Sequence, residues 1–293
     1  MQKILKGQEA AKAQLTRVHK ELQAGFRRPP GLAVIQVGNL GPSNAYIRKK
    51  KLIAEEWGIQ FTHAQLGSTV SKTELFAKID ALVADSKIDG LLVQLPLESV
   101  QLQTNAFVSE LLAHIPPEKD ADGLHSFNQG RLFTNECSPR EWSGPLPATP
   151  LGIFRLLEHY GYSLVGKNVV LVGKSRLVGL PTAILLSHAG ATVNICHSLT
   201  KDLAAHTRSA DILVVAAGKK HLITPAHIKK IGAVVIDVGI HYLPEGGLAG
   251  DVHPDSYPQC EAYSPVPGGV GPMTVASLIE NTLRLSFRSQ SKL

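Results

Sequence analysis

The stretch "VVLVGKSRLVGLP", residues 169–181, decides the fold of this 293-residue chain. An apolar run typical of a buried strand ends at Gly173, and a helix begins soon afterwards. Small residues at Gly173, Ser175 and Gly179 let a ligand approach the backbone, and free N–H groups at a helix start attract anions. The spacing departs from G-x-G-x-x-G, so an ordinary strand–helix turn is the alternative. The position of the stretch in a βαβ series favours a pyrophosphate site.

Strand and helix patterns alternate on both sides of this stretch. Strands are expected at 167–173, 191–197, 211–218 and 233–240, and helices at 149–161, 178–190, 202–210 and 224–232. This order is typical of the doubly wound parallel sheet of nucleotide-binding domains.

An earlier series has the same character, with strands at 31–38, 61–67 and 88–97 and helices at 43–57, 71–85 and 101–114. An amphipathic helix precedes it, and residues 115–150, rich in Pro, Gly, Asp, Asn and Ser, are expected to form loop and linker. A Gly/Pro loop at 265–272 leads into a final helix that fits neither series and could pack on the first domain. The sequence therefore predicts an α/β protein of two domains.

Composition limits the class of protein. The chain is 44% hydrophobic and 18% charged, as in globular proteins, and no apolar run is long enough to cross a bilayer. The N-terminus lacks the apolar core of a signal peptide, and the three cysteines form no C-x-x-C, so a reducing, cytosolic compartment is expected. The twelve histidines show no metal-ligand spacing, which predicts no metal site.

The net charge of +6 has two interpretations. A nucleic acid is one partner that such a charge can attract, but no basic stretch is interleaved with aromatic residues. An anionic small molecule is the simpler explanation.

Lys50 occupies an unexpected position on the helix predicted at 43–57. On a helical wheel it shares the apolar stripe of Tyr46, Ile53 and Trp57. A lysine there either extends its methylenes toward solvent or is held in a cleft, and the helix alone leaves the two even. The spacing brings Tyr46 and Lys50 together, and a lysine beside a phenol can lower the pKa of the phenol or share its proton.

Short-chain dehydrogenases use the same Y-x-x-x-K spacing, but there the Gly-rich turn precedes the pair within one domain. Here the turn follows the pair by more than a hundred residues, in a separate series, and that family is rejected.

Polar residues also stand near predicted strand ends, where ligands bind in open α/β sheets. Gln94, near the end of an apolar strand, either pairs with backbone or faces a cleft, and we favour the cleft. Asp120 and Asp122 lie in a loop at 118–131, where Asx-turn chemistry is the alternative to a carboxylate that faces a polar ligand.

The second strand of the later series bears on the cofactor. An NAD site usually has a carboxylate at its end to hold the ribose hydroxyls. This chain has His197 and Ser198 there, with Lys174 nearby, unless these are surface residues without a role. A missing carboxylate and an available cation favour NADP, whose 2′-phosphate is negatively charged.

Together these segments resemble the bifunctional methylenetetrahydrofolate dehydrogenase/cyclohydrolase family. The resemblance covers nearly the whole chain and rests on "SNAYIRKK", "DGLLVQLPL", "PPEKDADGLHSFNQGRL", "ATPLGI", "GKNVVLVGKSRLVGLP", "DILVVAAG", "VIDVGI", "GDV" and "PVPGGVGPMTVASLIENT", in this order. It implies an N-terminal catalytic α/β domain over residues 1–140, completed by the helix at 270–293. It also implies a doubly wound, NADP-binding Rossmann domain over 141–269.

The activity implied by the resemblance has two steps in one cleft. Methylenetetrahydrofolate is oxidised to methenyltetrahydrofolate by hydride transfer to NADP, and methenyltetrahydrofolate is then hydrolysed to 10-formyltetrahydrofolate. The implied catalytic residues are Lys50, Tyr46, Gln94 and Asp122, with Lys50 as proton carrier of the hydrolysis.

The resemblance also assigns binding roles. Tyr46, Gln94 and Asp122 are expected to contact the folate, Asp122 at the pterin, with Pro267, Gly268 and Gly269 as the wall of the folate site. The implied cofactor residues are Gly173, Lys174, Ser175, Val178, Gly179, His197, Ser198, Ala217, Gly218, Gly239, Ile240 and Thr274. A cytoplasmic homodimer in one-carbon metabolism and purine biosynthesis, with no nucleic-acid or membrane partner, is implied as well.

The chain departs from the family pattern at two positions, with Ala148 in place of a cysteine that is frequent in bacterial members, and Lys174 in place of arginine. Lysine makes a point contact, not a bidentate one, which weakens the preference for NADP over NAD. Three alternatives remain. Lys50 argues against a monofunctional dehydrogenase, and the set Tyr46, Lys50, Gln94 and Asp122 argues against a non-catalytic folate- or nucleotide-binding module. The third is a nucleic-acid binder, which only the pI supports.

Overall fold

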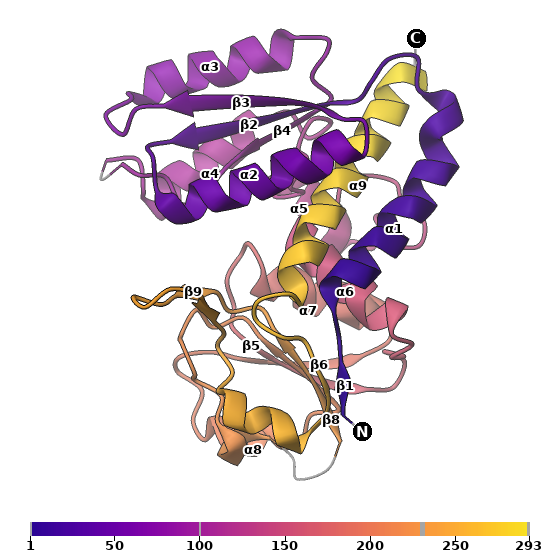
Figure 1. Ribbon diagram of the computed structural model, residues 1–293, viewed down its shortest axis with the longest axis vertical. Coiled ribbons are helices and arrows are strands. Elements are labelled where there is room, and N and C mark those ends of the chain that lie inside the picture. Colours follow the sequence, from indigo (N-terminus) through magenta and orange to yellow (C-terminus); the bar gives the residue numbers. More distant parts are fainter. Residues whose placement is uncertain (1, 100, 229–231, 292–293) are drawn as a thin grey trace. The chain divides into compact units, whose positions relative to one another are not determined.

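The computed structural model describes residues 2–99, 101–228 and 232–291. The chain forms two compact units (Figure 1). The Lys50 unit consists of Leu15–Ala148 and Val275–Leu293, and the Gly173 unit consists of Met1–Gln14 and Thr149–Thr274. The predicted domain bounds of 1–140 and 141–269 differ from these units chiefly in the first 14 residues, which belong with the later part of the chain.

The Lys50 unit is built on a parallel three-stranded sheet in the order β3-β2-β4. Its elements are β2 (Gly31–Val37), α2 (Gly41–Glu56), β3 (Gln60–Leu66), α3 (Lys72–Ala84), β4 (Gly90–Val93), α4 (Asn105–His114) and α5 (Ser126–Phe133). Odd-numbered residues of β2 such as Ile35 pack in a core with Ile79 of α3 and Leu111 of α4. On the opposite face, the even-numbered Gln36 of β2 donates to Asn44 of α2 at 2.6 Å, so α2 and its buried Lys50 lie on that side of the sheet.

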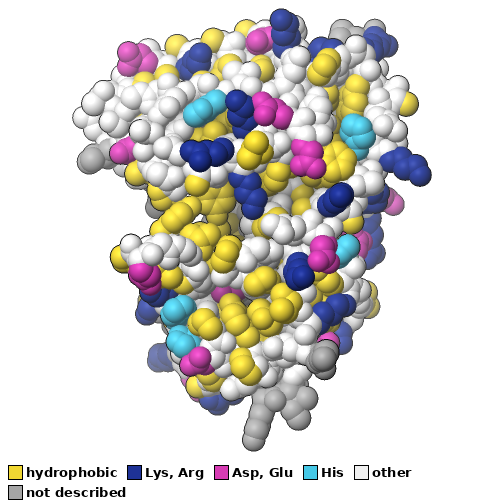
Figure 2. All heavy atoms as spheres, in the orientation of Figure 1, with side chains coloured by type: hydrophobic (Ala, Val, Ile, Leu, Met, Phe, Trp, Pro, Cys, Tyr) yellow, Lys and Arg dark blue, Asp and Glu magenta, His cyan; other side chains and the backbone are white. Residues whose placement is uncertain are grey.

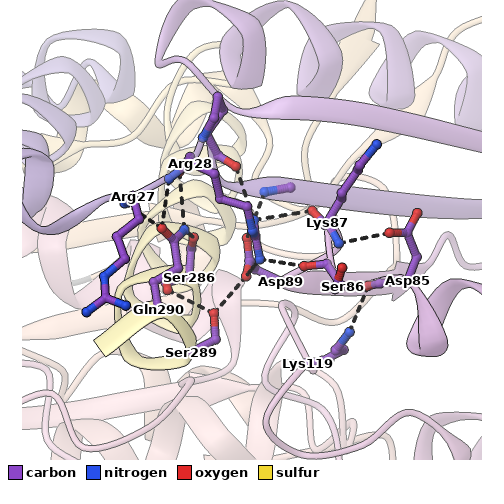
Figure 3. A network of polar contacts seen from close by, with 12 residues as sticks. Arg27, Arg28, Asp85, Ser86, Lys87, Asp89, Lys119, Ser286, Ser289 and Gln290 are labelled. Atoms are coloured by element: carbon purple, nitrogen blue, oxygen red, sulfur yellow. Dashed lines mark hydrogen bonds and ion pairs between the residues drawn. The ribbon is translucent and has the colours of Figure 1, made fainter. Parts of the chain in front are cut away.

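The final helix, α9 (Val270–Ser291), completes the Lys50 unit, as predicted. Figure 3 shows a polar network near its end: the Gln290 side chain accepts hydrogen bonds from the backbone N–H groups of Arg27 and Arg28, at 2.6 and 3.0 Å. Ser289 donates to Asp89 at 2.8 Å, and Asp89 in turn binds the Arg28 guanidinium. These contacts join the helix to the segment before β2 and to the start of β4.

The Gly173 unit contains a parallel six-stranded sheet in the order β1-β11-β8-β7-β5-β6. Its strands are β1 (Lys3–Ile4), β5 (Asn168–Val172), β6 (Thr192–Cys196), β7 (Ile212–Val215), β8 (Ala233–Asp237) and β11 (Cys260–Tyr263), with a small antiparallel pair, β9 (His241–Tyr242) and β10 (Leu248–Ala249). Its helices are α6 (Ala148–His159), α7 (Gly179–His188) and α8 (Leu203–Thr207), with 3₁₀ turns η2 (Pro225–His227) and η3 (Pro254–Gln259).

The strand order creates a topological switch point in this sheet. From β5 the chain passes through α7 to β6 on one side, and then returns to β7 on the other side of β5. Ligands of doubly wound sheets bind at such a point, beyond the carboxyl ends of the strands. In this chain those ends are Gly173 after β5 and residues 216–218 after β7.

Local sequence patterns missed some elements. The N-terminal helix is present as α1 (Gly7–Leu22), followed by the 3₁₀ turn η1 (Gln23–Gly25), but the two residues of β1 before it pair with β11, too few for a recognisable alternation. Helix α5 lies in the segment predicted as loop and linker. Of the helix predicted at 224–232, the structure has only η2, and residues 229–231 lie outside the described part.

The charged surface and the hydropathy of the helices can be compared with what a nucleic-acid or membrane partner would need. On the face drawn in Figure 2, Lys and Arg side chains are interspersed with Asp and Glu and do not form one basic stripe. Among the residues that the structure describes, no helix has the length and hydropathy needed to cross a bilayer.

Candidate active site

Helix α2 buries Lys50. The buried residues of the helix are Ser43, Ile47, Lys50 and Ala54, spaced three and four apart. Tyr46, which was expected at the centre of the buried stripe, is half-buried at its margin. The predicted stripe is therefore displaced by about one position, but Lys50 lies on it in both cases.

The Lys50 amine is held by Gln94. Lys50 is 6% exposed, and its Nζ donates a hydrogen bond of 2.9 Å to Oε1 of Gln94, the residue after β4. The Gln94 Nε2 donates to the carbonyl of Leu95 at 2.7 Å, which fixes the amide with its oxygen toward the lysine. Burial lowers the pKa of Lys50, and the negative charge of Asp122 opposes this shift. The neutral amine is thus more populated than in an exposed lysine.

The two carboxylates of the loop at 118–131 have different roles. Asp120 is buried and accepts hydrogen bonds from the N–H groups of Leu124 and His125 and from Asn128, so it organises the turn. Asp122 is half-buried and acts electrostatically on Lys50. Asp120 therefore has a structural role, although its backbone hydrogen bonds come from residues four and five positions further on and do not form an Asx turn. Asp122 is the carboxylate whose charge acts on Lys50.

Backbone packing fixes the position of Asp122. Gly123 has φ +68°, and a Cβ there would lie 2.3 Å from the carbonyl carbon of Leu146, so only glycine fits. Asn281 of α9 donates to the carbonyls of Ala121 and Leu146, at 2.9 and 2.8 Å. The final helix therefore positions the loop that carries Asp122.

The loop between β5 and α7 requires glycine at both ends, because neighbouring backbone occupies the space that a side chain would need. Gly173 has φ +127°, and a Cβ there would lie 2.1 Å from the carbonyl oxygen of Ala216. A Cβ on Gly179 would lie 2.2 Å from the carbonyl oxygen of Gly173. Ser175 Oγ accepts from the N–H groups of Val178 and Gly179, both at 3.2 Å, and Lys174 is exposed. This close-packed turn, with glycine at both ends and at the start of a helix, fits the phosphates of a dinucleotide.

All but one of the other predicted cofactor residues follow β6, β7 and β8 at the same edge of the sheet. His197 is half-buried, with Nδ1 accepting from the Leu199 N–H at 3.2 Å, and Ser198 is exposed. Ala217 and Gly218 follow β7, and Gly239 and Ile240 follow β8. Thr274 lies on α9 with its hydroxyl 3.1 Å from that of Thr149.

The predicted folate wall belongs to the Gly173 unit. Gly268 has φ +109°, and its carbonyl accepts from the Gly7 N–H at 2.7 Å. The Gly269 N–H donates to the carbonyl of Pro265 at 2.7 Å, which closes a rigid turn around Pro267. The structure thus brings Lys50, Gln94 and Asp122 together in one unit, and the Gly173 loop and residues 267–269 belong to the other.

Sequence reasoning assigned no role to Asp237, His241 and Asp251. All three bind each other or the loops after β7 and β8. The sequence did contain a sign of such a role for Asp237. A carboxylate at the end of the apolar run "AVVID" costs free energy to bury unless it has hydrogen-bond partners. As for metals, the described residues contain no group of three or more His, Cys, Asp or Glu able to hold one.

Two family models match the chain. The catalytic domain of tetrahydrofolate dehydrogenase/cyclohydrolase matches residues 5–122, and the NAD(P)-binding domain of the same family matches residues 147–290. A relative from Wolinella succinogenes, named bifunctional protein FolD, is 48% identical over 89% of this chain and 87% of its own length.

Solved structures of such proteins are similar throughout. The bifunctional FolD enzyme of Campylobacter jejuni has a TM-score of 0.90 at 37% identity, with all of both chains covered. The methylenetetrahydrofolate dehydrogenase-cyclohydrolase of Trypanosoma brucei, solved with NADP cofactor and inhibitor, has a TM-score of 0.88 at 34% identity, with 98% of both chains covered.

Proposed function

Since the chain belongs to the tetrahydrofolate dehydrogenase/cyclohydrolase family, we infer that it is a bifunctional enzyme. It oxidises methylenetetrahydrofolate to methenyltetrahydrofolate with NADP, and it hydrolyses methenyltetrahydrofolate to 10-formyltetrahydrofolate. The observation that carries this conclusion is the buried amine of Lys50, held at 2.9 Å by Gln94, because the hydrolysis requires a proton carrier.

The dehydrogenase step depends on positioning. NADP, when bound, accepts a hydride from the methylene carbon of the folate. Gly173, Ser175 and Gly179 are the residues that would hold its phosphates, with Lys174 and Ser198 for the 2′-phosphate. The folate nitrogen lone pair stabilises the cation that remains, so the protein has to align the reacting atoms and needs no proton carrier for this step.

In the cyclohydrolase step, Lys50 is the proton carrier. Water adds to the methenyl carbon while the neutral amine takes up a proton from it. The resulting ammonium returns a proton to the ring nitrogen as its bond to that carbon breaks. The hydroxyl on that carbon loses its proton to solvent as the C=O bond forms, so one proton is released in total and the formyl group stays on the other nitrogen. Burial, which lowers the pKa of Lys50, keeps the amine neutral before the proton is taken up and helps the ammonium to give the proton back. The charge of Asp122 stabilises the ammonium between the two halves of the cycle. Tyr46 orients or stacks on the substrate, and Asp122 also binds the pterin.

A spectroscopic assay tests both activities together. Purified protein is mixed with methylenetetrahydrofolate and NADP, in parallel with NAD, while reduced cofactor and methenyltetrahydrofolate are followed separately. Reduced cofactor that forms without accumulation of methenyltetrahydrofolate is the expected result. Accumulation of methenyltetrahydrofolate in step with reduced cofactor would identify a monofunctional dehydrogenase, and no signal with either cofactor would identify a binding module.

Exchange of Lys174 for glutamate is expected to impair NADP more than NAD. The carboxylate repels the 2′-phosphate, and loss of one charge-assisted contact corresponds to about tenfold in the KM for NADP. Steady-state kinetics with both cofactors measure this. Lys167→Glu is the matched control, since Lys167 is exposed just before β5, at the opposite end of that strand. Equal increases for NADP and NAD in Lys174→Glu would place the 2′-phosphate site elsewhere.

Exchange of Gln94 for glutamate is expected to shift the pH dependence of hydrolysis. A carboxylate in place of the amide oxygen 2.9 Å from Nζ favours the ammonium form and raises the pKa of Lys50. The acidic limb of the cyclohydrolase profile then moves to higher pH, whereas that of the dehydrogenase stays in place. Gln60→Glu, on the exposed start of β3, is the control. An unmoved acidic limb would remove Lys50 from the proton transfer.

The assembly and its compartment are part of the same proposal. We expect a homodimer formed through the NADP-binding units, which light scattering on the purified protein would test. The three cysteines are buried and free, which suits the reducing cytoplasm.

A further inference from the structure

Two buried carboxylates of the Gly173 unit have no part in the chemistry described above. Asp237 ends β8 and is 1% exposed, and Asp251, two residues after β10, is 0% exposed. Burial of a carboxylate costs free energy unless its oxygens accept hydrogen bonds. The donors that these oxygens bind therefore indicate what the pair contributes to the unit.

Asp251 holds the loop that follows β7. Its Oδ2 accepts hydrogen bonds from the backbone N–H groups of Ala217 and Gly218, at 2.7 and 2.9 Å. Its Oδ1 lies 2.7 Å from Nε2 of His241, the first residue of β9. One carboxylate thus fixes two consecutive N–H groups and an imidazole.

Asp237 holds Asp251 and the loop that follows β8. Its Oδ1 accepts from the N–H groups of Gly239 and Asp251, at 2.9 and 3.0 Å, and its Oδ2 accepts from the N–H of Val252 at 3.0 Å. Burial, with a smaller effect of the Asp251 charge, raises the pKa of Asp237 to about 6. Asp237 therefore sets the backbone position from which Asp251 reaches the β7 loop.

The packing around the pair leaves little freedom. A Cβ on Gly250 would lie 1.8 Å from Oδ2 of Asp237, and a Cβ on Gly239 would lie 2.4 Å from the backbone nitrogen of Asp251. Glycine is therefore required on both sides, and the carboxylates cannot move without displacing the loops. The arrangement is rigid, as expected for a support of a binding site.

The two loops at the switch point offer different chemistry. The turn between β5 and α7 provides a helix start and Lys174, which suit phosphates. After β7, the N–H groups of Ala217 and Gly218 donate inward to Asp251, so they do not serve an anion. We propose that Asp251 is a positioning residue that fixes the β7 loop as an uncharged wall for the nicotinamide portion of NADP. This proposal rests on the proposed function.

The test compares Asp251→Ala, Asp251→Asn and the wild-type protein. Loss of two bonds to a charged acceptor in the alanine variant is expected to weaken NADP binding, measured by calorimetric titration without folate, by about tenfold or more. The dehydrogenase KM for NADP rises and its kcat falls, because the hydride acceptor is less well aligned. Cyclohydrolase kcat, which needs no NADP, stays within about twofold.

The asparagine variant separates positioning from charge. Its amide oxygen can accept from Ala217 and Gly218 while its NH₂ group donates to His241 Nε2 in the tautomer protonated at Nδ1. NADP affinity is therefore expected to recover to within about threefold of the wild type. Asp255→Ala is the matched control, because this aspartate lies four positions further along the chain with its side chain 77% exposed.

Two outcomes would overturn the proposal. One is NADP affinity and dehydrogenase kinetics in Asp251→Ala that equal those of Asp255→Ala. The other is a parallel loss of both activities in the alanine and asparagine variants, which would make Asp251 a folding residue only. A wild-type protein that binds NADP but oxidises no folate would instead contradict the proposed function alone, since the titration reads NADP affinity directly.

If Asp251→Ala does not fold, the variant His241→Leu tests the positioning role of Asp251 instead. The His241 side chain is partly exposed, and the exchange removes only one of the three hydrogen bonds of Asp251. NADP affinity is then expected to fall by about threefold. An unchanged affinity in His241→Leu, together with an unfolded Asp251→Ala, would overturn the positioning role.

Discussion

Exchange of Lys50 for methionine is expected to reduce cyclohydrolase kcat by about 10²–10⁴, the range for loss of a general acid–base group. Methionine fills the buried position on α2 but cannot carry a proton. Part of the dehydrogenase activity remains, because hydride transfer depends on alignment of the folate and the cofactor. Separate assays of the two steps on the same preparation measure the ratio of the losses.

The control for this variant lies one residue further along the helix. Lys51 is exposed and pairs with Glu55 at 3.8 Å, so Lys51→Met removes an equal charge from the solvent side of α2 and leaves both activities intact. Equal losses of the two activities in Lys50→Met would mean that Lys50 shapes the substrate site and is not the proton carrier.

The burial of Lys50 could be predicted from the sequence because it depends on local helical geometry. Helical periodicity alone put a lysine on a buried stripe, and the structure confirms this although Tyr46 lies at the margin. Gln94 was recognised as a polar residue near the end of an apolar strand, which is also a local feature. The hydrogen bond between them joins residues 44 positions apart, and no pattern in either segment specifies it.

Features that depend on distant pairing were missed for the same reason. Strand β1 has two residues and exists only because β11 lies beside it. The carboxylates of Asp237 and Asp251 have roles only through loops that meet at the carboxyl edge of the sheet. The packing of the final helix on the first domain was expected, but the contacts that attach it were not. Gln290 and Arg28, for example, are 262 positions apart.

Exchange of Asp89 for alanine is expected to lower the free energy of unfolding of the Lys50 unit by about 3 kcal/mol, the cost of removing a buried carboxylate that accepts several hydrogen bonds. The Asp89 side chain is 1% exposed, and both its oxygens bind the Arg28 guanidinium at 2.7 Å. It also accepts from the Gly31 N–H at 3.0 Å and from Ser289 of α9. Denaturant unfolding at neutral pH, followed in the wild type and the variant, measures the difference.

The destabilisation by Asp89→Ala is expected to depend on pH, whereas a simple loss of packing would not. Burial favours the neutral carboxyl of Asp89, but hydrogen bonds from Arg28, Gly31, Ser289 and Ser286 outweigh it and lower the pKa. A carboxyl with a lowered folded-state pKa stabilises the protein fully above its unfolded-state pKa of about 3.9 and loses this contribution as pH falls through the folded-state value. The difference in the free energy of unfolding between the wild type and Asp89→Ala should therefore decrease as the pH is lowered.

The exposed pair of His114 and Asp80 supplies the control, at 2.8 Å but with the aspartate side chain 66% exposed. Asp80→Ala is expected to cost less than about 1 kcal/mol, since solvent screens the pair. If Asp89→Ala destabilises no more than Asp80→Ala, the contact between α9 and the start of β4 does not hold the helix in place. Asn281 and the apolar face of α9 would then fix the helix that positions the Asp122 loop.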